Sequence, residues 1–301
     1  MAVREKSRTP PPRIRRTGQS RLRIPTTPVP LTYRGRPLVM GVLNVTPDSF
    51  SDGGAFPDPD AAVQRGIQMA SEGVDLIDVG GESTRPGSQP VPLKEELRRV
   101  LPVVARLTNA VRIPLSVDTS KAEVASQALE AGASIVNDVT ALRGDSAMAG
   151  VIARRRAAVI LMHMRGTPQT MQRHPRYRDV LSEVSAFLLQ AAHEAEAAGV
   201  DRSRILVDPG LGFGKTVAHN LALLRGLPQL LSLGYPVVIG PSRKSFIGAV
   251  LEAEVPERLA GTLGCVAFAQ RCGTHVVRVH DVKPAAQLLR MLEAIETDQG
   301  R

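Results

Sequence analysis

Polar side chains that could bind a ligand or assist a reaction follow short runs of Val, Ile and Leu throughout this sequence. The side chains at the ends of these runs are Asn44, Glu82, Ser83, Thr84, Arg85, Asp118, Asn137, Asp138, His163, Asp208, Ser242, Arg243, Lys244, Arg278 and His280. They include carboxylates, amides, imidazoles and cations, and Asn44 offers a neutral carbonyl oxygen of the kind that suits a hard cation such as Mg²⁺. Each could also be an ordinary loop residue, so their meaning depends on whether the fold brings them together.

Several well-known catalytic patterns do not fit the sequence. Residues 210–216 resemble a phosphate-binding P-loop, but that motif requires glycine five residues before Gly214, where Pro209 stands. We expect these glycines instead to let the loop pass close to a flat ligand while Asp208 points inward. No group of His, Cys and carboxylate residues has zinc spacing, and no G-x-S-x-G nucleophile motif occurs.

The elements that must position the polar side chains alternate between two patterns after residue 37. Continuous apolar runs, typical of strands buried on both faces, occur at 38–43, 76–79, 114–117, 134–136, 158–162, 205–207, 236–239 and 276–279. Helical stretches at 61–72, 121–131 and 179–198 each end at a glycine, a residue that favours the left-handed cap of a helix. The alternation predicts eight strand–helix units.

Eight such units predict an α/β fold, a single-domain (β/α)8 TIM barrel. A doubly wound open sheet is the alternative, because periodicity alone does not exclude it. In a closed barrel the C-terminal ends of all strands surround one mouth, where active sites are built. The polar side chains would then form one ring. Taken singly, Asp118 and Asp208 could instead be helix N-caps, Arg278 a rim ion pair and Lys244 a solvated charge.

The net charge of +9 does not come from the predicted barrel. Residues 1–36 contain ten of the 38 Lys and Arg residues but one of the 29 Asp and Glu residues, which leaves the remainder balanced. We therefore expect no nucleic-acid binding by the barrel, at 37–301. The Arg- and Pro-rich segment 1–36 is predicted to be a disordered extension, because it has too few apolar residues to offset its ordering entropy. A nucleic-acid-binding protein that uses this extension stays open as a separate class.

The sequence predicts neither a secreted nor a membrane protein. No apolar run approaches the ~18 residues of a membrane span, and Arg15 and Arg16 are not followed by an apolar stretch. Cys265 and Cys272 fit neither a zinc spacing nor a disulfide framework, and we interpret them as small core residues in a reducing compartment. A cytoplasmic location is therefore expected.

The loops after the predicted strands resemble those of the dihydropteroate synthase family. The matching segments occur in order over residues 38–295 and are found at 41–54, 80–87, 116–119, 136–138, 161–164, 208–215, 242–244 and 278–281. The resemblance implies a (β/α)8 barrel that joins 6-hydroxymethyl-7,8-dihydropterin diphosphate to p-aminobenzoate in folate biosynthesis, giving 7,8-dihydropteroate and diphosphate. It also implies Mg²⁺ as the cofactor and a homodimer.

The same resemblance implies roles for individual side chains. The catalytic residues would be Asp118, Asp208, Lys244 and Arg278, and these four would bind the pterin together with Asn137. Diphosphate would contact Asn44, Thr84, Arg278 and His280, with Asn44 also the Mg²⁺ ligand. p-Aminobenzoate would be enclosed by Phe50, Arg85, Pro86, Phe213 and Ser242. His163 matches the family pattern without an assigned role.

Two alternatives remain close to this family. Pterin-binding methyltransferase barrels share the pocket, although segments 48–50 and 242–244 favour the synthase. A catalytically silent pterin binder is the other alternative, and the complete ring of polar side chains argues against it.

Overall fold

The strands close into a barrel in the computed structural model, which describes residues 22–46 and 58–296. The eight parallel strands are β3 (Leu38–Asn44), β4 (Leu76–Gly80), β5 (Leu115–Asp118), β6 (Ile135–Asp138), β7 (Ala158–Met162), β8 (Ile205–Asp208), β9 (Val238–Ile239) and β10 (Val276–Val279). They are hydrogen-bonded in the order β8-β7-β6-β5-β4-β3-β10-β9. A parallel bridge between Val207 and Val237 joins the two ends of this order. The predicted (β/α)8 barrel is confirmed, and the open sheet is wrong.

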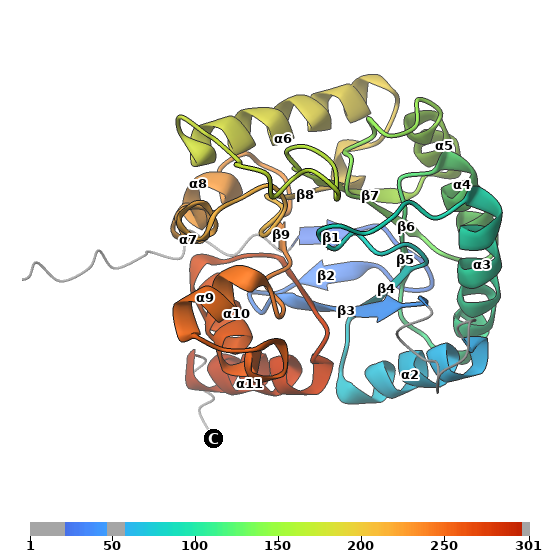
Figure 1. The fold of residues 1–301 in the computed structure, drawn as a ribbon. Helices are drawn as coiled ribbons and strands as arrows, with labels where there is room; N and C mark the ends of the chain where they lie inside the picture. Colours follow the sequence, from blue (N-terminus) through green and yellow to red (C-terminus); the bar gives the residue numbers. More distant parts are fainter. Residues whose placement is uncertain (1–21, 47–57, 297–301) are drawn as a thin grey trace, which may run out of the picture.

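Helices surround the strands, as Figure 1 shows. They are α2 (Pro59–Glu72), α3 (Leu93–Ala110), α4 (Ala122–Glu130), α5 (Met148–Arg155), α6 (Val180–Ala197), α7 (Val217–Arg225), α8 (Leu227–Leu231), α9 (Ser245–Leu251), α10 (Leu259–Cys272) and α11 (Val282–Glu296). Gly73, Gly132 and Gly199, which follow the three predicted helices, have φ between 93° and 113°. Glycine fixes these helix ends because other residues are strained there. Within the described ranges, no helix is both long and apolar enough to span a membrane.

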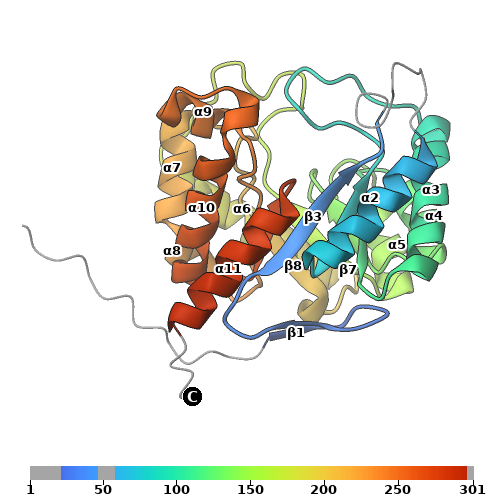
Figure 2. The ribbon, with the colours of Figure 1, turned by 90° about the horizontal axis from the view of Figure 1, so that it is seen from below.

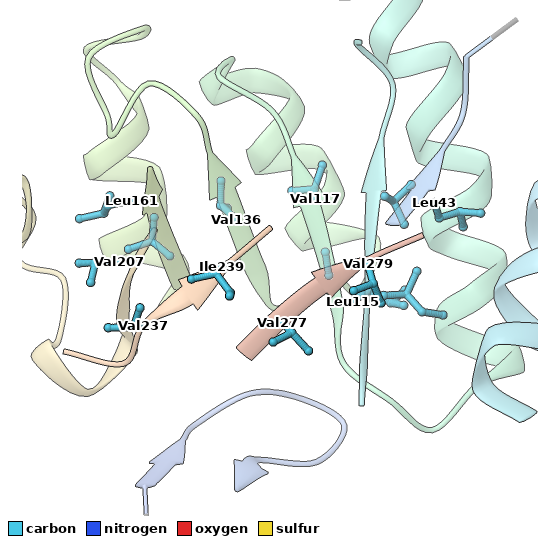
Figure 3. Packing of buried hydrophobic residues seen from close by; sticks show 14 of the residues in the cluster. Leu43, Leu115, Val117, Val136, Leu161, Val207, Val237, Ile239, Val277 and Val279 are labelled. Atoms are coloured by element: carbon cyan, nitrogen blue, oxygen red, sulfur yellow. The ribbon is translucent and has the colours of Figure 1, made fainter. Parts of the chain in front are cut away.

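Strand residues alternate between the two sides of the barrel wall. Outward-facing side chains such as Val117, Val136 and Leu161 belong to the larger apolar cluster, between strands and helices (Figure 3). The inward-facing apolar side chains form a smaller cluster within the barrel: Leu38, Met40, Leu76, Ile135, Ala158, Ile160, Leu206, Val238 and Val276. The strands are thus buried on both faces, as their continuous apolar runs predicted, and the inner cluster occupies their N-terminal parts.

A β-hairpin covers the N-terminal end of the barrel and lies below the strands in Figure 2. Its strands, β1 (Leu22–Ile24) and β2 (Leu31–Tyr33), pair antiparallel. Ile24 and Leu31 are almost fully buried and extend the inner apolar cluster. The hairpin therefore closes the end of the barrel opposite the mouth.

Part of the prediction for residues 1–36 is wrong, because residues 22–36 are ordered against the barrel. Ser134 donates a hydrogen bond to the Thr27 carbonyl oxygen at 3.1 Å, and Arg204 donates to that of Pro25 at 2.6 Å. The few apolar side chains of this segment cannot form a core by themselves, but the open end of the barrel buries them. Residues 1–21 lie outside the described residues.

Candidate active site

Inward-facing positions change from apolar to polar toward the C-terminal ends of the strands. Backbone pairing places Asn44 beside Gly80, and Gly80 beside Asp118. It also places Asp118 beside Asn137. A Cβ atom at Gly80 would lie 3.5 Å from that of Asp118 and 3.8 Å from Asn44 Oδ1, so glycine leaves these two polar groups facing a shared space. Predicted site residues from three strands thus lie side by side at the barrel mouth.

Arg278, on β10, forms two ion pairs at the base of the mouth. Its Nε lies 2.6 Å from Asp78 Oδ2, and its Nη2 lies 2.8 Å from Asp118 Oδ2. Asn137 Nδ2 donates to the same Asp78 oxygen at 3.0 Å. Burial raises the pKa of Asp118 to about 7; Arg278 opposes this shift and Asp78 adds to it. The cluster holds a planar cation and an amide in fixed orientations.

Asp78 is a site residue that was not predicted from the sequence. Its side chain is fully buried, and within the described part of the chain its Oδ1 atom has no hydrogen-bond partner. Leaving a buried carboxylate oxygen unpaired is costly, so such an atom calls for a bound partner. The sequence feature that could have identified Asp78 is its position as a single carboxylate inside the apolar run 76–79. It lies two residues before Gly80 and faces inward.

Asp118 and Asp208 do not cap helices, although capping was the simplest alternative for each. The N-cap positions of α4 and α7 are occupied by Lys121 and Thr216. Asp208 instead accepts the backbone N–H of Gly210 at 2.7 Å, within the loop that follows β8. Both carboxylates are therefore buried groups of the barrel mouth.

Lys244 brings a second cation to the mouth, beside Asp208. Burial raises the pKa of Asp208, and Lys244 is close enough to oppose that shift. The Lys244 ammonium donates to the Leu211 carbonyl oxygen and lies 4.4 Å from the centre of the Phe213 ring. Burial lowers the pKa of Lys244 to about 8, although Asp208 favours its charged form. The Lys244 ammonium therefore lies close to both Phe213 and Asp208.

Ser242 and His280 link the loop after β9 to the end of β10. The Ser242 hydroxyl accepts the His280 backbone N–H at 3.1 Å and lies 3.0 Å from His280 Nδ1. Burial lowers the pKa of His280 to about 3, and the cations Arg278 and Arg85 add to the effect. His280 is therefore neutral at pH 7 in the free protein, and its imidazole can donate a hydrogen bond.

The loop at 81–92 carries other predicted substrate contacts at the end of the barrel opposite the hairpin (Figure 2). Those contacts are half-buried or exposed: Thr84, Arg85 and Pro86. Arg99 Nη1 holds the start of this loop by donating to the Gly81 carbonyl oxygen at 2.9 Å. The Gly87 N–H donates to the Pro168 carbonyl oxygen, also at 2.9 Å, so the loop reaches the segment that follows β7. The predicted contact Phe50 lies outside the described residues.

The donor set at the mouth fits a metal ion that arrives with a phosphate ligand. Asn44 is half-buried and offers one neutral oxygen. Among residues 22–46 and 58–296, no three His, Cys, Asp or Glu side chains cluster in a way that could hold an ion. Mg²⁺ commonly keeps one or two protein ligands and completes its shell with phosphate oxygens and water. The single amide oxygen of Asn44 at the mouth fits an ion that would be completed in this way.

Known proteins with the same fold share much of this sequence. The family model described as pterin binding enzyme matches residues 40–280. A dihydropteroate synthase from Synechocystis sp. is 46% identical over 261 residues, which cover 86% of this chain and 90% of that relative. A solved structure of the Xanthomonas albilineans dihydropteroate synthase with 4-aminobenzoic acid has a TM-score of 0.87 and 46% identity, covering 92% of this chain and 99% of that one. A structure from the same organism in complex with 7,8-dihydropteroate has a TM-score of 0.83 and 43% identity, covering 91% and 99%.

Proposed function

The chain belongs to the dihydropteroate synthase family, and from that membership we propose how its side chains divide the work of the reaction. The reaction joins 6-hydroxymethyl-7,8-dihydropterin diphosphate to p-aminobenzoate and releases 7,8-dihydropteroate and diphosphate, so the chain is a transferase of folate biosynthesis. The assignment of roles rests chiefly on one observation. Carboxylates, an amide and a guanidinium from β4, β5, β6 and β10 are joined by ion pairs and hydrogen bonds at the buried base of one mouth.

The pterin is bound by Asp118, Asn137, Asp208, Lys244 and Arg278 in this proposal. The guanidine-like edge of a pterin presents parallel N–H donors, which the carboxylate of Asp208 can accept in pairs. Lys244 donates to the carbonyl oxygen and ring nitrogen of the pterin. Arg278 stacks on the pterin face, a contact that suits a planar cation. Its two ion pairs support this role, since they fix the plane of the guanidinium before the ligand enters.

Diphosphate is held by Asn44, Thr84, Arg278 and His280. Asn44 is also the proposed protein ligand of Mg²⁺, and the ion supplies positive charge that offsets the charge of the diphosphate. Arg278 contributes a second fixed positive charge, while neutral His280 contributes a hydrogen bond. The link between His280 and Ser242 supports a placement in which diphosphate and p-aminobenzoate occupy neighbouring parts of the mouth.

p-Aminobenzoate is enclosed by Phe50, Arg85, Pro86, Phe213 and Ser242. Ser242 donates to its carboxylate, and Phe213 provides an apolar wall for the ring. In the proposed reaction the bond between the pterin methylene carbon and the diphosphate oxygen breaks, and its electron pair leaves with diphosphate. The amine nitrogen of p-aminobenzoate then forms the new bond to that carbon and loses one proton. Asp118 and Asp208, when ionised, stabilise the cationic pterin electrostatically.

Two substitutions test the pterin assignment. Lys244→Ala and Asp208→Asn should each abolish binding of 6-hydroxymethyl-7,8-dihydropterin in calorimetry, while circular dichroism and the melting temperature keep a folded barrel. Retained binding by both folded variants would contradict the assignment.

We also propose a cytoplasmic homodimer in which the barrel of residues 37–301 and the hairpin within residues 22–36 form one domain. The contacts of residues 22–36 support treating the hairpin as an integral cover of that barrel. Large apolar side chains exposed on α9, α10 and α11 support a second copy as the partner of this face: Val250, Leu251, Phe268, Met291 and Ile295. The free thiols of Cys265 and Cys272 support a reducing compartment. Light scattering of the protein and of a Phe268→Asp variant tests the dimer, which the variant should weaken.

A further inference from the structure

Lys215 is buried beneath the mouth, although lysine is normally solvated. Its side chain is 3% exposed, and it follows the glycine-rich loop 209–214 after β8. His163, which follows β7 directly, is 6% exposed. Neither residue has a part in the proposed binding of the substrates. A buried ammonium must be paired with acceptors to be tolerated, so its partners indicate what it does.

Burial lowers the pKa of Lys215 to about 7, although Asp208 favours its charged form. When Lys215 is protonated, all three of its ammonium hydrogens can be used within the protein. Nζ lies 2.9 Å from His163 Nδ1, 2.9 Å from the Phe213 carbonyl oxygen and 3.3 Å from that of His163. Burial lowers the pKa of His163 to about 3, and Lys215 adds to that shift. The imidazole is therefore neutral, so Nδ1 can accept a hydrogen bond while Nε2 carries the proton. Lys215 thus ties the end of β7 to the loop after β8.

The glycine-rich loop depends on such ties because its backbone has no regular partner strand. Four successive carbonyl oxygens, of residues 211–214, accept hydrogen bonds from the side chains of Lys244, Gln172, Lys215 and Tyr177. Gly210 has a φ of 66°, and a side chain there would collide with the His163 carbonyl oxygen. The loop therefore packs closely against the backbone of His163, and Lys215 binds the backbone of Phe213.

We propose that Lys215 and His163 form a buried clamp that positions Phe213 as the wall of the p-aminobenzoate site. Lys215 is a positioning residue, because its hydrogens are directed to protein atoms, among them the backbone carbonyl oxygen of Phe213. This inference rests on the proposed role of Phe213. Two pterin ligands also touch this loop, because Lys244 donates to the Leu211 carbonyl oxygen and Asp208 accepts the Gly210 N–H. The pterin side still depends less on the clamp, since Asp118, Asn137 and Arg278 are carried by strands.

Steady-state kinetics of Lys215→Met, which keeps the length of the side chain and removes its charge, test the clamp. The KM for p-aminobenzoate should rise about 10- to 100-fold, the effect of losing hydrogen bonds to a charged group. The dissociation constant for 6-hydroxymethyl-7,8-dihydropterin should change by less than about threefold. A merely structural lysine would instead reduce kcat through a smaller folded fraction, with both constants unchanged, and that result would overturn the proposal. Equal weakening of both substrates would also overturn it.

Two variants of His163 keep the proposal testable if Lys215→Met does not fold. His163→Asn retains an acceptor close to the Nδ1 position, and His163→Leu removes it. The clamp predicts a near-normal KM for p-aminobenzoate in His163→Asn and an increase like that of Lys215→Met in His163→Leu. Identical behaviour of the two His163 variants would contradict it.

Further variants distinguish a failure of the clamp proposal from a failure of the proposed p-aminobenzoate site. Lys283→Met, at an exposed position of α11, is the matched control and should leave both constants unchanged. Phe213→Ala should raise the KM for p-aminobenzoate by itself. An unchanged KM in Phe213→Ala would refute the proposed site, whereas a raised KM there with an unchanged KM in Lys215→Met would refute the clamp alone.

Discussion

Asp78 offers a sharp mutational test because one buried carboxylate orients two proposed pterin ligands. Replacing Asp78 by Ala removes the 2.6 Å hydrogen bond from Arg278 Nε and leaves Asn137 Nδ2 without its acceptor. A hydrogen bond to a charged group contributes about 1.5–3 kcal/mol, and an unsatisfied buried donor costs about 1–3 kcal/mol. Because Arg278 keeps Asp118 as a partner, we expect the free energy of unfolding to fall by about 3 kcal/mol.

Only part of that loss should appear in ligand binding, namely the cost of ordering Arg278 and Asn137 when the pterin enters. We therefore predict a 10- to 100-fold weaker pterin affinity for Asp78→Ala, measured by calorimetry (about 1.4–2.7 kcal/mol). Asp78→Asn keeps both acceptor contacts and loses only the charge, so its affinity should fall by about tenfold at most. Since Asp78 helps to raise the pKa of Asp118, Asp118 should also titrate at lower pH in Asp78→Asn.

Asp75, which precedes the same strand at the hairpin end, provides the control for lost stability. Its carboxylate pairs with Arg36 at 3.1 Å, far from the mouth. Asp75→Ala should lower the melting temperature without weakening pterin binding. Wild-type pterin affinity in folded Asp78→Ala would refute the view that Asp78 orients the pocket.

Three other perturbations should give distinct results. Burial lowers the pKa of His275 to about 4, so its contribution to stability is present above its unfolded pKa of 6.5 and is lost as the pH falls toward 4. The stability difference between the wild type and His275→Gln, from urea unfolding, should shrink by about 1.4 kcal/mol per pH unit across that window, and a constant difference would count against it. Leu31→Ala should lower the free energy of unfolding by about 2–4 kcal/mol, since Leu31 is 4% exposed beneath the barrel, whereas an unchanged value would mean that the hairpin does not pack there. Removing Mg²⁺ with a chelator should stop turnover but leave binding of the diphosphate-free pterin intact; loss of that binding would place the ion elsewhere.

Much of the barrel could be predicted because its strands are local apolar runs rich in Val, Ile and Leu. The runs at 158–162 and 276–279 match β7 and β10 at both ends. The run at 236–239 forms only the short strand β9, because Pro236 has no N–H to donate and Val237 makes a single bridge to Val207. The hairpin could not be predicted, since Ile24 and Leu31 are buried only by the end of a barrel formed from distant residues.

The site was partly predictable because many of its residues lie at the ends of these local apolar runs. Asp118, Asn137 and Asp208 lie at the ends of recognisable strands, where the fold turns polar residues toward the mouth. Asp78 lies inside its strand and not at the end of it. Only a knowledge of which strand residues face the barrel interior shows that this carboxylate belongs to the site. The clamp between Lys215 and His163 joins residues 52 positions apart, so it depends on how two loops pack.

The central claim, that this barrel mouth catalyses dihydropteroate formation, is tested most directly by product analysis. The purified protein would receive 6-hydroxymethyl-7,8-dihydropterin diphosphate, p-aminobenzoate and Mg²⁺, with dihydropteroate and diphosphate both quantified. Equal amounts of the two products, absent in the Lys244→Ala variant, are the predicted result. Measurable pterin binding with neither product formed would contradict the claim and identify a pterin-binding protein without synthase activity.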